Sequence, residues 1–262
     1  MVRAAPERRT WRLLAALSAA LVLLLGAGTA WKVLAEQEQD EPFRYAGGIT
    51  AVELDLENSS VQVIGEAGSA VSITQHERWT VDRPRVTRAV TGSTLHLTAR
   101  CPRSWVLLAG RCGVQFALVV PPTTRLTAKG GASAVYAEGL TGEISARAGS
   151  GSVTLKRDSG PIAVRVDSGS VTGQELGSAR VKAQADSGSV TLGFVQPPQE
   201  LTLVTDSGSA TATLPRGSGY QVVSSVGSGS SDVDPGLQDA SSRRTITATT
   251  GSGSLSLGYG SG

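Results

Sequence analysis

Residues 185–192 read Ala-Asp-Ser-Gly-Ser-Val-Thr-Leu, and residues 166–172 read Val-Asp-Ser-Gly-Ser-Val-Thr. Their Ser-Gly-Ser core recurs through the second half of the chain, with central glycines 18, 19, 20, 21 and 24 residues apart: Gly151, Gly169, Gly188, Gly208, Gly229 and Gly253. Self-similarity at this interval is typical of proteins built from stacked structural repeats.

Hydrophobicity alternates on both sides of the central glycine. Seven residues before it stands an aliphatic side chain in every copy: Ile144, Ile162, Val181, Leu201, Val222 and Ile246. Small or apolar residues follow at most of the alternate positions before and after the glycine. A period of two indicates β-strands, because successive side chains of a strand point to opposite faces. Each unit is therefore predicted to be a strand, a Ser-Gly turn, a second strand and a loop.

One such unit cannot bury its own apolar side, whereas units stacked at about 4.8 Å share a continuous core. The sequence thus predicts an all-β fold: a right-handed β-solenoid or β-helix-like stack of ~18–24-residue Ser-Gly repeats. We expect each central glycine to supply a positive φ or a close approach of two backbones.

The regular repeats occupy residues 130–262, and residues 47–129 are predicted to form a less regular β-rich part that is continuous with them. Longer connections in this first part predict hairpins that cap one end of the stack. At the other end, the final coil, residues 255–260, is predicted to be an open edge that allows self-association.

The N-terminus carries targeting information. Residues 13–31 contain no charged side chain and are bracketed by Trp11 and Trp31, with basic residues before them and acidic residues after them. At about 1.5 Å per residue this run approaches the ~30 Å of a bilayer core. The sequence therefore predicts a transmembrane helix over 13–34, a basic cytoplasmic tail over 1–12, and a linker over 35–46 to an extracytoplasmic domain.

A cleaved secretory signal has the same order of basic and apolar residues, so this alternative stays open. Both interpretations export the same domain across the plasma membrane.

Cys101 and Cys112 are the two cysteines of the chain. In an oxidising compartment, a pair at this spacing predicts a disulfide that closes a hairpin loop. A reactive dithiol is the alternative, although no Cys-x-x-Cys motif is present.

Composition weighs against several classes of function. The 24 basic and 22 acidic residues leave a net charge of +2, with no basic run for nucleic acid. The chain has two histidines, His76 and His96, and no Gly-x-Ser-x-Gly or Ser-x-x-Lys motif, so we expect neither an enzyme nor a bound cofactor.

Asp167, Asp186 and Asp206 precede equivalent turns in successive repeats. Stacking would bring their carboxylates together, so they are weak candidates for a Ca²⁺ ladder. The equivalent residues 149, 227 and 251 are glycine, and hydrogen bonding of each Asp to its own turn is the simpler interpretation, which predicts no metal.

The Val/Ala-Asp-Ser-Gly-Ser-Val-Thr-Leu repeats, the strand that ends in Val119-Val120-Pro121 and the closing Ser-Gly-Ser-Leu-Ser-Leu resemble a bacterial family of β-strand-repeat surface proteins, the "putative adhesin" family. The resemblance covers residues 48–262. It implies a membrane-anchored or secreted protein with a solenoid-like domain, and it assigns no catalytic residue.

Together these observations predict a non-enzymatic surface-binding or scaffold protein of the bacterial envelope. Its expected partners are a cell-envelope polymer or a membrane or surface protein. An envelope-stress or signalling accessory that acts through a membrane protein is the second hypothesis, and a glycan hydrolase with two paired carboxylates is the third.

Overall fold

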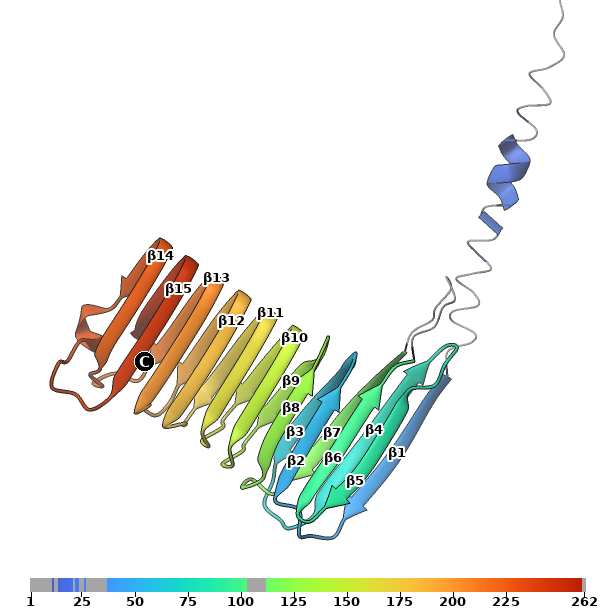
Figure 1. Cartoon of the computed structure of the whole chain (residues 1–262), viewed down its shortest axis with the longest axis horizontal. Helices are drawn as coiled ribbons and strands as arrows, with labels where there is room; N and C mark the ends of the chain where they lie inside the picture. Colours follow the sequence, from blue (N-terminus) through green and yellow to red (C-terminus); the bar gives the residue numbers. More distant parts are fainter. Residues whose placement is uncertain are drawn as a thin grey trace, which may run out of the picture.

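The computed structural model describes residues 11, 14–20, 22, 23, 26, 37–102 and 112–260. Apart from helical residues before residue 27 and one short 3-10 helix, η1 (Pro235–Leu237), its regular structure is β-strand. The prediction of an all-β fold is confirmed (Figure 1).

The predicted membrane segment lies largely outside the described residues, as does the basic tail before it. Residues 14–20, 22, 23 and 26 are helical. Within the described part of the chain, no helix combines the length and the apolar character needed to cross a bilayer. The membrane anchor and the cleaved signal both stay predictions.

The Ser-Gly-Ser repeats form long parallel strands whose central glycines pair with one another. These strands are β10 (Ile144–Lys156), β11 (Ile162–Leu176), β12 (Arg180–Phe194), β13 (Glu200–Leu214), β14 (Gln221–Val233) and β15 (Thr245–Tyr259). Because the register aligns the apolar columns as well as the glycines, the core runs without interruption from one strand to the next.

Each long strand changes direction at its central glycine. In β10 the buried side chains are Ile144, Ala146 and Ala148 before Gly151, and Val153 and Leu155 after it. In a straight strand the buried side chains would all stand at even-numbered or all at odd-numbered positions. Here the buried positions are even-numbered before the glycine and odd-numbered after it. The chain therefore turns about the core at this point, and its two halves belong to two layers that enclose the core between them.

The glycines permit the turn because two backbones meet there. Gly188 has φ +149°, and a Cβ atom on it would lie 1.8 Å from the carbonyl oxygen of Gly169 on the neighbouring strand. The same overlap, at 1.7–1.8 Å, recurs at Gly169, Gly208, Gly229 and Gly253. No other residue type fits such a column without displacing the adjacent strand.

The first part of the chain repeats this unit with each long strand divided in two. The first layer contains β2 (Ala51–Leu56), β6 (Thr94–Arg100) and β8 (Arg125–Gly130), and the second layer contains β3 (Ser59–Gly65), β7 (Cys112–Val120) and β9 (Ala134–Glu138). Strands β8 and β9 pair with the two halves of β10, so the two parts of the chain form one continuous sheet.

Antiparallel strands close the first end, as the longer connections predict. They are β4 (Val71–Trp79), β5 (Arg85–Thr91) and β1 (Gln37–Tyr45), and β1 is the edge strand (Figure 1). The sequence predicts a linker over residues 35–46, but residues 37–45 form β1. Its half-buried positions include Gln39 and Glu41, which face a polar cluster rather than an apolar core, so the strand shows no hydrophobic alternation.

At the end of the stack opposite β1, the edge strand is not the C-terminal strand that the sequence predicts. Strand β15 lies between β13 and β14, and β14 is the edge (Figure 1). At inward-facing positions where other repeats bury aliphatic side chains, β14 carries Ser224 and Ser231, and both are exposed. Polar residues at core positions suit the last unit of a stack, so the placement of the edge at residues 255–260 is wrong.

Replacement of Gly188 by Ala tests the glycine column. We expect the variant to lose about 3 kcal/mol of unfolding free energy or more, since it combines an unfavourable φ with a steric overlap. Chemical denaturation measures the loss. Gly193→Ala in the same strand is the matched control, because its Cβ would meet no atom closer than 3.7 Å. Equal effects of the two substitutions would contradict the assignment.

Asp158 provides a test of stability against pH. Its side chain is buried in the loop after β10 and accepts hydrogen bonds from the backbone amides of Leu140 (2.7 Å) and Lys156 (3.2 Å). Burial raises the pKa of this carboxyl from 3.8 to about 6. Between these two values the native state binds a proton that the unfolded state has released, so this group's contribution to stability falls as pH rises.

We expect Asp158→Asn to abolish the part of the pH dependence of stability that Asp158 contributes. The measurement is the difference between the denaturation midpoints at pH 4 and at pH 7. The exposed Asp206→Asn is the control, and we expect it to retain the wild-type pH dependence. An unchanged pH dependence in Asp158→Asn would contradict the assignment.

Candidate functional site

A groove crosses the outer face of the second layer over β4, β7, β3, β9 and β10. Two adjoining cavities of 510 Å³ and 450 Å³ form it, and they share Ser60, His76, Gln115 and Ala134. We call this continuous depression the polar groove.

The strand register explains the shape of the polar groove. Ser60 pairs with Ala134, and Gln62 pairs with both Ala117 and Tyr136 across neighbouring strands. Short side chains therefore line up across three strands and form a floor. The longer side chains of His76 and Tyr136 stand at its two sides.

Both side walls are held by hydrogen bonds. The Nδ1 atom of His76 contacts the carboxylate of Asp40 on β1. The hydroxyl of Tyr136 donates to Oε2 of Glu138 at 2.5 Å, and this hydrogen bond raises the pKa of the Tyr136 phenol. Arg157 in turn pairs with Glu138, so the tyrosine ring has a fixed position.

Most polar side chains of the groove are neutral hydrogen-bonding groups, the hydroxyls and amides of Ser60, Gln62, Gln115 and Thr154, beside the aromatic ring of Tyr136. One charged side chain, Arg78, also lines the groove and pairs with Glu38 at 2.7 Å. Amides and hydroxyls both donate and accept hydrogen bonds, as the hydroxyl groups of a sugar require. The arrangement therefore suits recognition of a neutral, hydroxyl-rich polymer.

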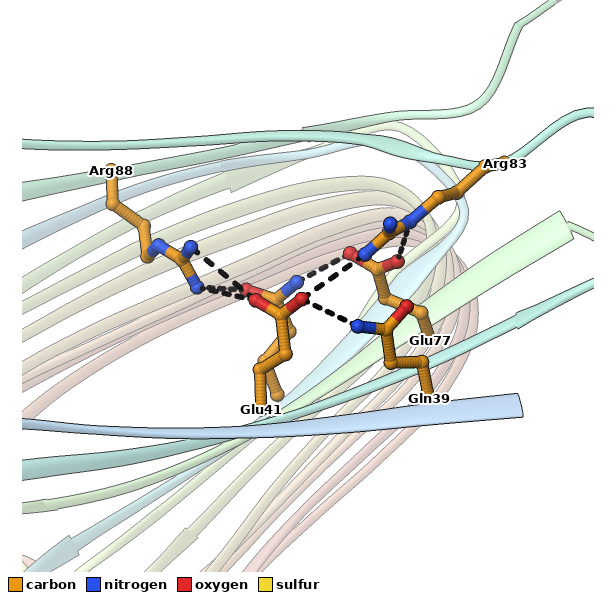
Figure 2. Close-up of polar contacts among 6 residues, drawn as sticks. Gln39, Glu41, Glu77, Arg83 and Arg88 are labelled. Atoms are coloured by element: carbon orange, nitrogen blue, oxygen red, sulfur yellow. Dashed lines mark hydrogen bonds and ion pairs between the residues drawn. The ribbon is translucent and has the colours of Figure 1, made fainter.

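The strongest concentration of charge lies elsewhere, at the β1 end of the stack (Figure 2). Glu77 is buried and accepts a hydrogen bond from Arg83 at 2.6 Å. Arg83 and Arg88 both contact Glu41, at 3.1 Å and 3.4 Å. Gln75 donates to Glu77 and accepts from Arg88 at 3.0 Å.

This polar cap, Gln39, Glu41, Gln75, Glu77, Arg83 and Arg88, closes the core against solvent. Arg83 lies over the Trp79 ring and Arg88 over the Phe43 ring, so the arginines cover apolar surface as well as pairing with the acids. Because each of its carboxylates already contacts an arginine, we interpret the cap as structural rather than catalytic.

The remaining residues singled out from the sequence do not converge on one site. Cys101 and Cys112 form a disulfide between the ends of β6 and β7, and the segment between them lies outside the described residues from 103 to 111. His96 lies 3.2 Å from Glu53 on the outer face of the first layer, away from the polar groove.

Two of the three aspartates that are weak candidates for a Ca²⁺ ladder, Asp167 and Asp186, are bridged by an arginine. Arg165 donates to Asp186 at 2.7 Å, and its Nε atom lies 3.7 Å from Asp167. In the described parts of the chain, no three His, Cys, Asp or Glu side chains are grouped closely enough to hold a metal. The guanidinium thus lies where a bridging cation would be needed.

Sequence reasoning singled out His76 but no other residue that the two cavities of the polar groove share. The alternation identifies the outward positions of β3, β7 and β9 but not which strands are neighbours. Gln62 and Gln115 are more than 50 residues apart in the chain, and only the pairing of β3 with β7 brings them together.

No protein-family model and no curated protein matches the chain. Among solved structures, it is similar to a "putative cell adhesion protein" from Clostridium sporogenes, at 12% identity and a TM-score of 0.44, over 86% of this chain and 100% of that one. It is also similar to a "putative adhesin" from Bacteroides fragilis, at 10% identity and a TM-score of 0.37, over 84% of this chain and 97% of that one. Both TM-scores lie below 0.5, so neither comparison establishes a shared fold.

The structural role of the polar cap is testable by Arg83→Ala. This variant leaves the buried Glu77 without its arginine, so we expect the unfolding free energy to fall, by less than for a fully buried pair because Arg83 is partly exposed, but by more than in the control below. Arg125→Ala breaks the exposed Arg125–Glu143 pair instead, and we expect it to cost less than about 1 kcal/mol. Urea denaturation measures both, and losses of the same size would contradict the structural interpretation.

Proposed function

We propose that this chain is an exported, non-enzymatic binding protein of the bacterial envelope, with a right-handed β-solenoid domain. Its N-terminal segment anchors it in the plasma membrane, with residues 1–12 in the cytoplasm. In this proposal the polar groove binds a neutral, glycan-like stretch of a cell-envelope polymer.

The polar groove is the observation that carries the proposal. It is elongated, crosses several strands and presents exposed amides at Gln62 and Gln115 beside the fixed ring of Tyr136. Polymer recognition needs such an open groove, because a chain that extends beyond the site cannot enter a closed pocket. The hydroxyl and amide lining supplies the hydrogen bonds that orient a sugar.

Two further features support the setting. The Cys101–Cys112 disulfide fits an oxidising compartment outside the cytoplasm. The in-register stack of parallel strands supports the solenoid, since every added unit extends the outer face by one row of solvent-facing side chains.

Cosedimentation of the full-length protein, in a nonionic detergent, with isolated cell-wall sacculi tests the proposal. We expect saturable binding that is lost after the wall polymers are stripped. The double variant Gln62→Ala/Gln115→Ala removes two exposed amides without disturbing the core, and we expect its affinity to fall about 10-fold.

Thr191→Ala is the matched control, because Thr191 is exposed on the same outer face but lies outside the polar groove. We expect it to bind like the wild type. Failure of the wild type to bind sacculi would overturn the proposal and favour a membrane protein as partner, as in an envelope-stress or signalling accessory, to be sought by crosslinking on intact cells.

A further inference from the structure

The opposite outer face, on the first layer, carries a row of basic side chains beside the glycine turn. Lys129, Arg147 and Arg165 are aligned in register on β8, β10 and β11, at the strand spacing of about 4.8 Å. They line a 520 Å³ pocket together with Gly130, Gly131 and Gly149. The lining also contains three carboxylates, which contact Arg100 or Arg165: Asp55, Glu57 and Asp167. We call it the cationic pocket.

Two of these cations have no counter-ion. Within the described residues, the side chains of Lys129 and Arg147 make no ion pair or hydrogen bond, although both are exposed and adjacent. The segment 103–111, which follows a residue of the pocket rim, contains no Asp or Glu in its sequence. Neighbouring like charges repel unless an anion lies between them.

The arginines at the two sides of the pocket are already paired with carboxylates, so we expect an anionic ligand to bind at the centre. On one side Arg100 pairs with Asp55 at 2.6 Å, and on the other Arg165 pairs with Asp186 at 2.7 Å. A polyanion that ran along the whole row would meet these carboxylates. A compact anion between Lys129 and Arg147 meets one of them, Asp55, which lies opposite Lys129 on β2 and whose charge Arg100 offsets.

We propose that the cationic pocket binds a phosphomonoester, with its phosphate held between the Lys129 ammonium and the Arg147 guanidinium. The charge of about −2 on such a group at neutral pH matches the two unpaired cations. Arginine offers a planar fork of donors and lysine a point charge, and both are used for phosphate recognition. The glycines of the lining leave room for the attached alcohol. The inference goes beyond the proposed function and does not depend on it, since the polar groove lies on the other layer.

Isothermal titration calorimetry of the full-length protein in a nonionic detergent, at low ionic strength, tests this proposal. The probes are glycerol 3-phosphate, inorganic phosphate and succinate. We expect saturable binding of glycerol 3-phosphate, and we expect Lys129→Ala/Arg147→Ala to weaken it at least 10-fold. Both side chains are exposed, so an unchanged melting temperature serves as the check on folding.

The control is Arg180→Ala/Lys182→Ala, which removes the same two charges from exposed positions on the same layer. These side chains also lack an ion pair, but Glu143 and Glu200 line their groove. We expect this variant to bind within about 2-fold of the wild type, since only long-range charge is lost.

If the two double variants weakened the binding of glycerol 3-phosphate equally, the loss would follow from the lower net charge alone, and the proposal would be overturned. Binding of succinate as tightly as glycerol 3-phosphate would also overturn it, because the pocket would then not select phosphate. Tighter binding of glycerol 3-phosphate than of inorganic phosphate supports an esterified ligand, whereas equal binding of the two would overturn the assignment of a phosphomonoester in favour of the free ion. Neither result bears on sacculus binding through the polar groove.

Discussion

The close contact of successive backbones at the central glycines is the constraint on which the rest of the structure depends. From Gly169 onward, each central glycine approaches the carbonyl oxygen of a glycine on the adjacent strand so closely that a single methyl group would occupy the same space. This contact sets the register of every long strand pair, because a slip by one residue would place a serine side chain opposite the glycine and exchange the buried and exposed faces. The alternating columns of the core therefore follow from the glycines.

A stack held in this way has a narrow core and two vulnerable ends. Inward side chains such as Ala146, Ala183 and Ala212 are small and fully buried. The two ends are closed by different means. At β1 an arginine–glutamate cluster covers the last apolar residues, while at β14 serine replaces the aliphatic residues that would otherwise be exposed.

The same geometry creates two outer faces of different chemistry. On the second layer, short side chains on neighbouring strands leave a neutral groove between His76 and Tyr136. On the first layer, stacking places Lys129 beside Arg147 without a counter-ion. Since the core separates the two faces, one ligand can occupy each of them without competition.

The sequence by itself determined the repeat, the β class and the turn glycines, because these features are local and recur at a fixed interval, and the short spacing of the two cysteines predicted their disulfide. It indicated hairpins at the first end, but it did not determine the two edge strands β1 and β14 or the site. The sequence did not predict β1, because its half-buried Gln39 and Glu41 contact a polar cluster that includes Arg83, far along the chain. Nor did it predict that β15 lies between β13 and β14, because the neighbours of a strand depend on the tertiary structure. The polar groove, the cationic pocket and the Arg165 bridge between two aspartates all depend on which strands lie side by side. Only the folded chain decides that, since periodicity specifies which face a residue takes but not which residue stands next to it.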